Sequence, residues 1–314
     1  MNQGKKISLS VLIAVIISVF LFFTIMFSLP DHLFQSYEDF FSSNLSDGDK
    51  IFILGSSHVY AINPIIVSDK LKESNYEFDV YNLGSPGDDF EERERAVDMM
   101  IKNEPKIVMF GIEPRSFESA GRTITELPNN PLPQIPSINE FFNILDLGDK
   151  KGIIKNPKFA LIRTISSPME KEIEEHPYPN SPFLKYEVDA ARLSQSDELE
   201  KIKPEYVGKI NSIEKNSNLH ALNNIIKKLE ENDIKVIIFV TPHSKFYLDK
   251  YPELQRNVFQ DILDEISRDN KIYSLYEKYA EDNVWHDHTH LAANDETKFY
   301  SEDIADFIIK ELER

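Results

Sequence analysis

Short apolar runs that end at a glycine recur along the chain, and helical patterns separate them. Two such runs are 51–54 and 107–110, which end at Gly55 and Gly111, and a further strand candidate, 78–83, ends at Gly84. A continuous apolar run of this length is typical of a strand buried on both faces. Strands that alternate with helices form a parallel sheet. The sequence therefore predicts a three-layer α/β/α fold with a flavodoxin-like, mostly parallel sheet.

The same rhythm continues in the second half of the chain. Further strands are predicted over 236–240 and 271–275. Amphipathic helices are expected around 90–101, 219–229, 258–266 and 304–312, where apolar residues recur at helical spacing. Residues 116–216 are rich in proline and interrupt the rhythm, so we expect an inserted subdomain or lid there. The α/β domain is expected to span 50–314, with this insertion inside it.

The N-terminal segment predicts a membrane anchor. Residues 7–30 contain no charged side chain, and a helix of that length can cross a bilayer. Lys5 and Lys6 precede the run, so the positive-inside rule places the N-terminus in the cytoplasm and the domain outside. We expect 1–30 to be a cytoplasmic N-terminus and a single transmembrane helix, followed by a spacer over 31–49. A cleaved signal peptide is the alternative, but its apolar region would be shorter.

Charge and cysteine content exclude several classes of function. The net charge of −18 argues against nucleic acid as a partner, because a phosphate-backbone binder needs a basic face. The sequence contains no Cys, which excludes disulfides, thiolate metal sites and a cysteine nucleophile.

Polar residues follow the predicted strands, at the edge where ligands bind to parallel sheets. The candidates in chain order are Ser56, Ser57 and His58, then Gly87, then Glu113 and Arg115, then His243, then Asp287 and His290. A serine becomes a nucleophile when a histidine removes its proton, and a carboxylate orients that histidine. Glycine-containing turns supply backbone N–H donors for the developing oxyanion. These residue types point to acyl transfer.

The order of these motifs resembles the SGNH (GDSL-like) hydrolase superfamily. The matching blocks are Gly55-Ser56-Ser57, Asn82-x-x-x-x-Gly87 and Asp287-x-x-His290. In the first block Ser56 stands in place of the family aspartate, and this variant is similar to membrane-anchored branches that handle O-acyl groups on cell-surface polymers, the DltD-like and alginate-acetylation-like proteins. The resemblance implies that Ser57 is the nucleophile, His290 the general base and Asp287 its orienting carboxylate. It also implies that the amides of Ser57 and Gly87 form the oxyanion hole.

The third block of the superfamily is altered in this chain. Glu113 stands where the family places an asparagine, and an ionised glutamate cannot donate a hydrogen bond. A side-chain donor to the oxyanion is therefore in question. Ser56 is the alternative candidate for the nucleophile. We expect the substrate pocket to include His58, Glu113, Arg115 and His243.

These observations together lead to one expected function and two alternatives. We expect an extracytoplasmic esterase or O-acyltransferase at the cell membrane that acts on acylated surface carbohydrate or polymer. It would have a membrane-bound acyl donor as partner and no cofactor or metal. A catalytically inactive binding protein of the same fold is one alternative. A metal-dependent hydrolase is the other, because His286, His288 and His290 alternate and would share a face of an extended segment.

Overall fold

The computed structural model describes residues 37, 40–43, 45–85, 90–118, 178–184, 209–287 and 289–314. The predicted anchor over 7–30 lies outside the described residues, as do most of the spacer and most of the insertion. Among the helices in the described ranges, none combines the length and apolarity that a membrane crossing needs.

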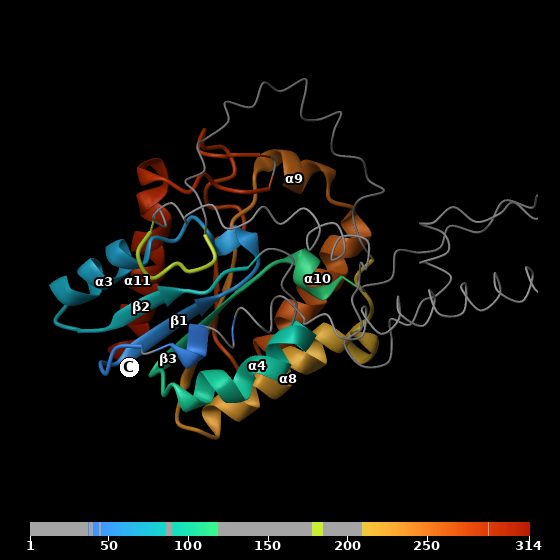
Figure 1. Cartoon of the computed structure of the whole chain (residues 1–314). Coiled ribbons are helices and arrows are strands. Elements are labelled where there is room, and N and C mark those ends of the chain that lie inside the picture. The colour runs from blue at the N-terminus through green and yellow to red at the C-terminus, as the bar shows by residue number, and fades with distance from the viewer. Residues whose placement is uncertain are drawn as a thin grey trace, which may run out of the picture. The chain divides into compact units, whose positions relative to one another are not determined.

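A five-stranded parallel sheet forms the centre of the domain (Figure 1). Its strands are β1 (Lys50–Leu54), β2 (Asp79–Asn82), β3 (Ile107–Ile112), β4 (Lys235–Val240) and β5 (Ile272–Ser274). Their order is β2-β1-β3-β4-β5, and every neighbouring pair is parallel. This is the flavodoxin-like order of doubly wound sheets. The predicted fold class and all the predicted strands are confirmed.

Helices cover both faces of the sheet and give the three predicted layers (Figure 1). On one face α3 (Pro64–Glu73) packs against α11 (Lys298–Leu312). On the other face α4 (Phe90–Lys102) packs against α8 (Ser217–Glu230). The helix α10 (Glu253–Ile266) lies on the same side as α4, because Phe117 contacts both Phe90 and Phe259.

An uninterrupted apolar run such as 107–110 arises because the strand contributes side chains to the core on both faces of the sheet. In β3, Ile107 and Met109 join a core cluster that also holds Leu71 of α3. Phe110 faces the other way and packs on Phe90 of α4, with ring centroids 6.1 Å apart. A strand covered on both faces needs no polar alternate positions.

Two helices differ from the sequence prediction, which places none between 54 and 78 or between 240 and 253. The helix α3 begins at Pro64, and the side chain of Asn63 accepts a hydrogen bond from the amide of Ile65 at 3.0 Å. An asparagine N-cap followed by proline at the first helical position is a helix-start signal. The short α9 (Lys245–Lys250) begins in a similar way after the N-cap Ser244.

The described parts of the insertion contact the α/β domain at two places. Glu118 and Ile210, near the two ends of the insertion, form an isolated antiparallel bridge, and the amide of Ile210 donates to Oε1 of Gln255 in α10 at 2.6 Å. The segment 178–184 lies beside the edge strand β2, where the amide of Asn82 donates to the carbonyl of Asn180 at 2.9 Å. Tyr178 and Leu184 in this segment also pack against Ala293. The role of the insertion as a lid stays a prediction.

Candidate active site

The turn after β1 forms a short 3-10 helix, η1 (Ser57–Val59), which lies on the sheet edge because three glycines make room for Val59. A Cβ atom added at Gly55, Gly84 or Gly111 would lie 2.6, 2.4 or 2.6 Å from a methyl carbon of Val59. Only glycine allows such a close approach. We call Gly55, Gly84 and Gly111 around Val59 the Val59 socket. It seats the helix that carries Ser57.

The buried side chain of Asn82, the last residue of β2, fixes the same turn. Its Nδ2 donates to the carbonyls of Val59 and Ile62, both at 2.8 Å. Its Oδ1 accepts from the amide of Gly84 at 3.0 Å. Buried carbonyls need such partners, since an unsatisfied one costs free energy. The positioning role of Asn82 depends on contacts across the fold, so the place of Asn82 in a sequence motif does not reveal it.

Arg93 of α4 supports the turn from the opposite layer. It is only 1% exposed, and its guanidinium donates to the carbonyl of Gly55 at 3.1 Å. Its guanidinium carbon also lies 5.5 Å from the ring centroid of Tyr37. The local sequence gives no sign of this role, because Arg93 stands in a run of acidic and basic residues typical of a solvated helix face.

The structure brings Ser57, His290 and Asp287 into one hydrogen-bonded chain. The Oγ atom of Ser57 lies 2.8 Å from Nε2 of His290. The Nδ1 atom of His290 lies 2.8 Å from Oδ2 of Asp287. All three side chains are half-buried, so the site stays open to solvent. Ser57, His290 and Asp287 thus have the relative positions that acyl transfer requires of a nucleophile, a base and an orienting carboxylate.

A small hairpin between buried Trp285 and Leu291 presents His290 to the serine. These two residues form an antiparallel bridge, and the amide of His286 donates to the carbonyl of His290 at 2.8 Å. Inside the hairpin, Oδ1 of Asp287 accepts from the amides of Thr289 and His290, both at 2.7 Å. The Thr289 hydroxyl donates to the same oxygen at 3.0 Å. Asp287 therefore shapes the loop as well as orienting the imidazole.

The environment of Asp287 keeps it ionised. Burial alone would raise its pKa, but the hydrogen bond to His290, the charge of His290 and the backbone amides of Thr289 and His290 outweigh burial. The pKa of Asp287 is consequently well below its usual value. A carboxylate at this position can hold Nδ1–H of the imidazole throughout the neutral range.

The two neighbouring serines contact different partners. The Ser56 hydroxyl donates to Oε1 of Glu113 at 2.5 Å, whereas that of Ser57 meets His290. Ser56 also caps η1 by accepting from the amide of His58 at 3.4 Å. The geometry therefore favours Ser57 over Ser56 as the reacting hydroxyl.

Beside the triad, His58, Glu113 and His243 form a buried cluster, hereafter the His58–Glu113–His243 cluster. Their exposed fractions are 5%, 2% and 0%. Nε2 of His58 lies 3.0 Å from Oε2 of Glu113. The His58 ring lies 4.6 Å from that of His290 and 5.0 Å from that of His243. These three predicted pocket residues gather, while Arg115 is exposed on η2 (Pro114–Phe117).

Burial and neighbouring charge set the ionisation of this cluster. Burial raises the pKa of Glu113, but the charge and hydrogen bond of His58, followed by His243 and Ser56, bring it well below its usual value. Burial, then the charge of His58, lowers the pKa of His243 well below its ordinary value. Glu113 is therefore a carboxylate and His243 a neutral imidazole at neutral pH.

Other predicted site features are only partly described. The amide of Ser57 opens η1, where no preceding helical carbonyl can accept its proton. Gly87, the second predicted oxyanion donor, lies outside the described residues. His288 of the alternating histidines also lies outside them, and His286 is exposed. Both ring nitrogens of His290 are engaged by Ser57 and Asp287 in this arrangement.

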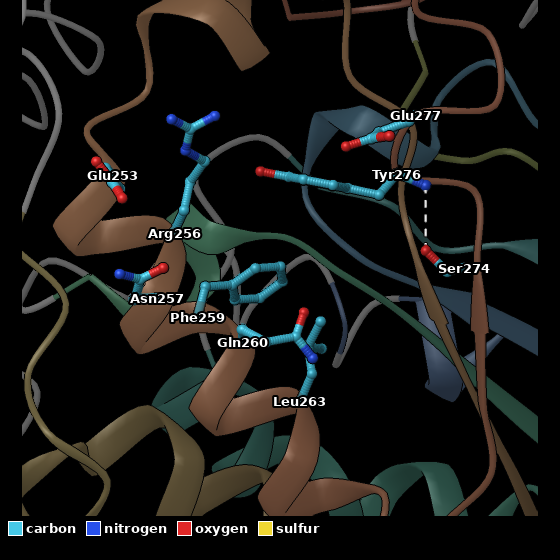
Figure 2. Close-up of a pocket in the computed structure, with 9 residues that line it drawn as sticks. All are labelled: Glu253, Arg256, Asn257, Phe259, Gln260, Leu263, Ser274, Tyr276 and Glu277. Atoms are coloured by element: carbon cyan, nitrogen blue, oxygen red, sulfur yellow. Dashed lines mark hydrogen bonds between the residues drawn. The ribbon is translucent and has the colours of Figure 1, made fainter.

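A surface pocket of about 440 Å³ lies between α10 and the segment after β5 (Figure 2). Its lining includes Arg256, Phe259, Tyr276 and Glu277, but none of the triad residues. The Tyr276 ring packs against His243, with ring centroids 5.2 Å apart. Tyr276 is thus a wall between this pocket and the buried cluster.

Comparison with protein-family models and with curated proteins found no match. Among solved structures, the chain is similar to TesA, with a TM-score of 0.42 and 9% identity over 83% of this chain and 98% of that one. A GDSL-like lipase from Bacteroides thetaiotaomicron gives a TM-score of 0.41 and 8% identity over 89% and 97%. A lipase from a goat rumen metagenome gives 0.37 and 10% over 82% and 98%. Likenesses this distant carry no argument about the site, whose chemistry is inferred from its own geometry.

Proposed function

We propose that this chain is an SGNH-type serine esterase or O-acyltransferase. The observation that carries the proposal is the hydrogen-bonded chain from Ser57 through His290 to Asp287. The fold supports it, because these side chains meet at the carboxyl edge of a doubly wound parallel sheet, where such folds bind their ligands.

The reaction follows from the geometry. The Ser57 Oγ attacks the ester carbonyl carbon, and its proton passes to Nε2 of His290. Asp287 stabilises the resulting imidazolium through Nδ1–H. The tetrahedral intermediate then expels the alcohol, which takes the proton from His290, and an acyl ester remains on Ser57. Water or a sugar hydroxyl, deprotonated by His290, attacks this ester and restores the serine.

The oxyanion of the intermediate needs donors that are in place beforehand. We assign this role to the backbone amides of Ser57 and Gly87. Glu113, at the position of the family asparagine, is a carboxylate that accepts a hydrogen bond from Ser56, so it cannot donate one to the oxyanion. An oxyanion hole built from backbone amides distinguishes this chain from the usual family pattern.

The finer assignment concerns location and substrate. The uncharged run over 7–30 supports a single-pass anchor with the domain outside the cytoplasm. This location favours acylated surface carbohydrate or polymer as substrate, with a membrane-bound acyl donor as partner. The resemblance to DltD-like and alginate-acetylation-like proteins favours the same substrate and partner. Removal of residues 1–30 should shift the protein from the membrane fraction to the soluble fraction. Retention in the membrane fraction would contradict the anchor.

The test of the chemistry uses the full chain and two readouts. A fluorophosphonate probe should label the wild type, and a short-chain aryl acetate should be hydrolysed. Ser57→Ala should lose both, and the label should map to the peptide that contains Ser57. Because labelling needs no natural acceptor, it detects a transferase as well as a hydrolase. A Ser57→Ala variant that still reacts would contradict the assignment, and an inert wild type would favour the non-catalytic binding protein.

A further inference from the structure

We propose that His58, Glu113 and His243 bind a divalent transition-metal ion, best matched by Zn²⁺. Each residue offers one ligand atom, and these atoms lie within 4.8 Å of one another. Two imidazoles and one carboxylate are a donor set that proteins use for zinc with a fourth position left open. The proposal revises the expectation of no metal and concerns residues other than the alternating histidines.

Two of the three ligand atoms are in direct contact. Nε2 of His58 and Oε2 of Glu113 are 3.0 Å apart. Two ligands of one tetrahedral zinc ion, with bonds of about 2.0–2.1 Å, lie about 3.3 Å apart. The spacing of this pair therefore suits two ligands of one ion.

His243 supplies the independent indication that a ligand belongs here. Its side chain is fully buried, and in the described part of the chain neither Nδ1 nor Nε2 has a hydrogen-bond partner. A buried imidazole without partners costs free energy, so native proteins normally satisfy such nitrogens. A bound ion satisfies one of these nitrogens directly. The three ligand atoms lie within 4.8 Å of one another, and ligands of one tetrahedral zinc ion lie about 3.3 Å apart, so binding of the ion must draw them closer.

The three ligands come from three different loops. His58 lies in the turn after β1, Glu113 follows β3, and His243 follows β4. A single ion at this place would join the three strand-end loops that surround Ser57 and His290. Because the ion binds the folded chain and not the unfolded one, it should raise the melting temperature.

The experiment uses the purified full chain and the metal alone. After expression with added Zn²⁺ and removal of loosely bound metal, elemental analysis should find about one zinc per chain. Co²⁺ in its place should give the visible absorption of a four-coordinate site. His243→Gln and Glu113→Gln should each weaken binding at least about tenfold, since changes even outside the ligand set cost that much. His220→Gln, at an exposed histidine of α8, is the matched control and should bind like the wild type.

Two outcomes would overturn the proposal. One is a wild-type chain that binds no metal, as expected if water alone occupies the cluster. The other is binding that survives His243→Gln but is lost in the double variant His286→Ala/His288→Ala, which would place the ion at the alternating histidines. Because that double variant leaves the buried cluster untouched, it decides between the two sites even if His243→Gln folds poorly.

Discussion

The Oγ atom of Ser57 and the Nε2 atom of His290 lie 2.8 Å apart, although 233 positions separate the two residues in the sequence. Two separate devices create this contact. The Val59 socket seats the helix that carries the serine, and a hairpin closed between Trp285 and Leu291 presents the histidine. Each device can be tested by itself.

The neighbouring serines should differ in their effect on turnover. Ser56→Ala removes a hydrogen bond to Glu113 but leaves the contact between Ser57 and His290 intact. We expect its kcat on an aryl acetate to fall by about tenfold at most, against on the order of 10³-fold or more for Ser57→Ala. Equal losses in the two variants would show that the serine assignment is wrong.

Two substitutions separate the two roles of Asp287. Asp287→Asn keeps an oxygen for the amides of Thr289 and His290 but loses the charge that orients the imidazole. We expect kcat to fall on the order of 10⁴-fold, and the melting temperature at pH 7 to fall because the stabilising charge of the carboxylate is lost. Asp287→Ala should lose activity and lower the melting temperature further, because the hairpin also loses its internal acceptor. Thermal melts beside kinetics check this, and full activity in Asp287→Asn would refute it.

The depressed pKa of Asp287 predicts a dependence of stability on pH. A carboxyl whose pKa is lower in the folded state stabilises the fold at pH values above its unfolded pKa, about 3.9. This contribution is lost as the pH falls below that value towards the folded pKa. Denaturant titrations at pH 7, 4 and 3 should show the free energies of unfolding of wild type and Asp287→Asn converging with acidification. A constant difference would contradict the lowered pKa.

The two hydrogen bonds that Nδ2 of Asn82 donates should contribute to the stability of the fold. Asn82→Asp replaces them with an oxygen that faces the carbonyls of Val59 and Ile62. We expect at least about 2 kcal/mol of destabilisation at pH 7, because two buried carbonyls lose their partners. Lowering the pH should recover part of the loss, since a protonated Asp can donate once. Equilibrium unfolding of Asn82→Asp at pH 7 and pH 5 measures this loss of stability. A free energy of unfolding equal to that of the wild type would exclude a stabilising role for the Asn82 side chain.

A double-mutant cycle tests the Val59 socket. A Cβ at position 84 would lie 2.4 Å from a Val59 methyl carbon, so Gly84→Ala must displace η1. We expect a cost of about 1–3 kcal/mol and a loss of turnover. In a Val59→Ala background the same change should cost at least about 1 kcal/mol less, as coupled neighbours do. Additive effects on the free energy of unfolding would mean that the two positions are independent.

The sheet could be predicted because the signals that mark each strand lie in residues that are neighbours in the sequence. Each apolar run and the glycine after it mark a strand end, and the alternation with helices leaves few topologies. The candidate triad came from the types and order of a few polar residues at those ends. The helix α3 was also within reach, since Asn63 and Pro64 carry its start signal.

The supporting residues could not be predicted in the same way. Arg93 has the same local sequence context as the charged residues around it, and only packing between layers buries it. The His58–Glu113–His243 cluster joins loops after three strands, so no sequence spacing reveals it. Such residues become visible only when the layers and strand ends are in place.

The segment 178–184 is a fixed point within the insertion, because the amide of Asn82 at the end of β2 donates to the carbonyl of Asn180. A second fixed point is Ile210, whose amide donates to Oε1 of Gln255 in α10 and which forms a bridge with Glu118. Neither point involves the segments that carry Ser57 and His290. The geometry of the triad is therefore set by the α/β domain, and the insertion is tied to that domain through other residues.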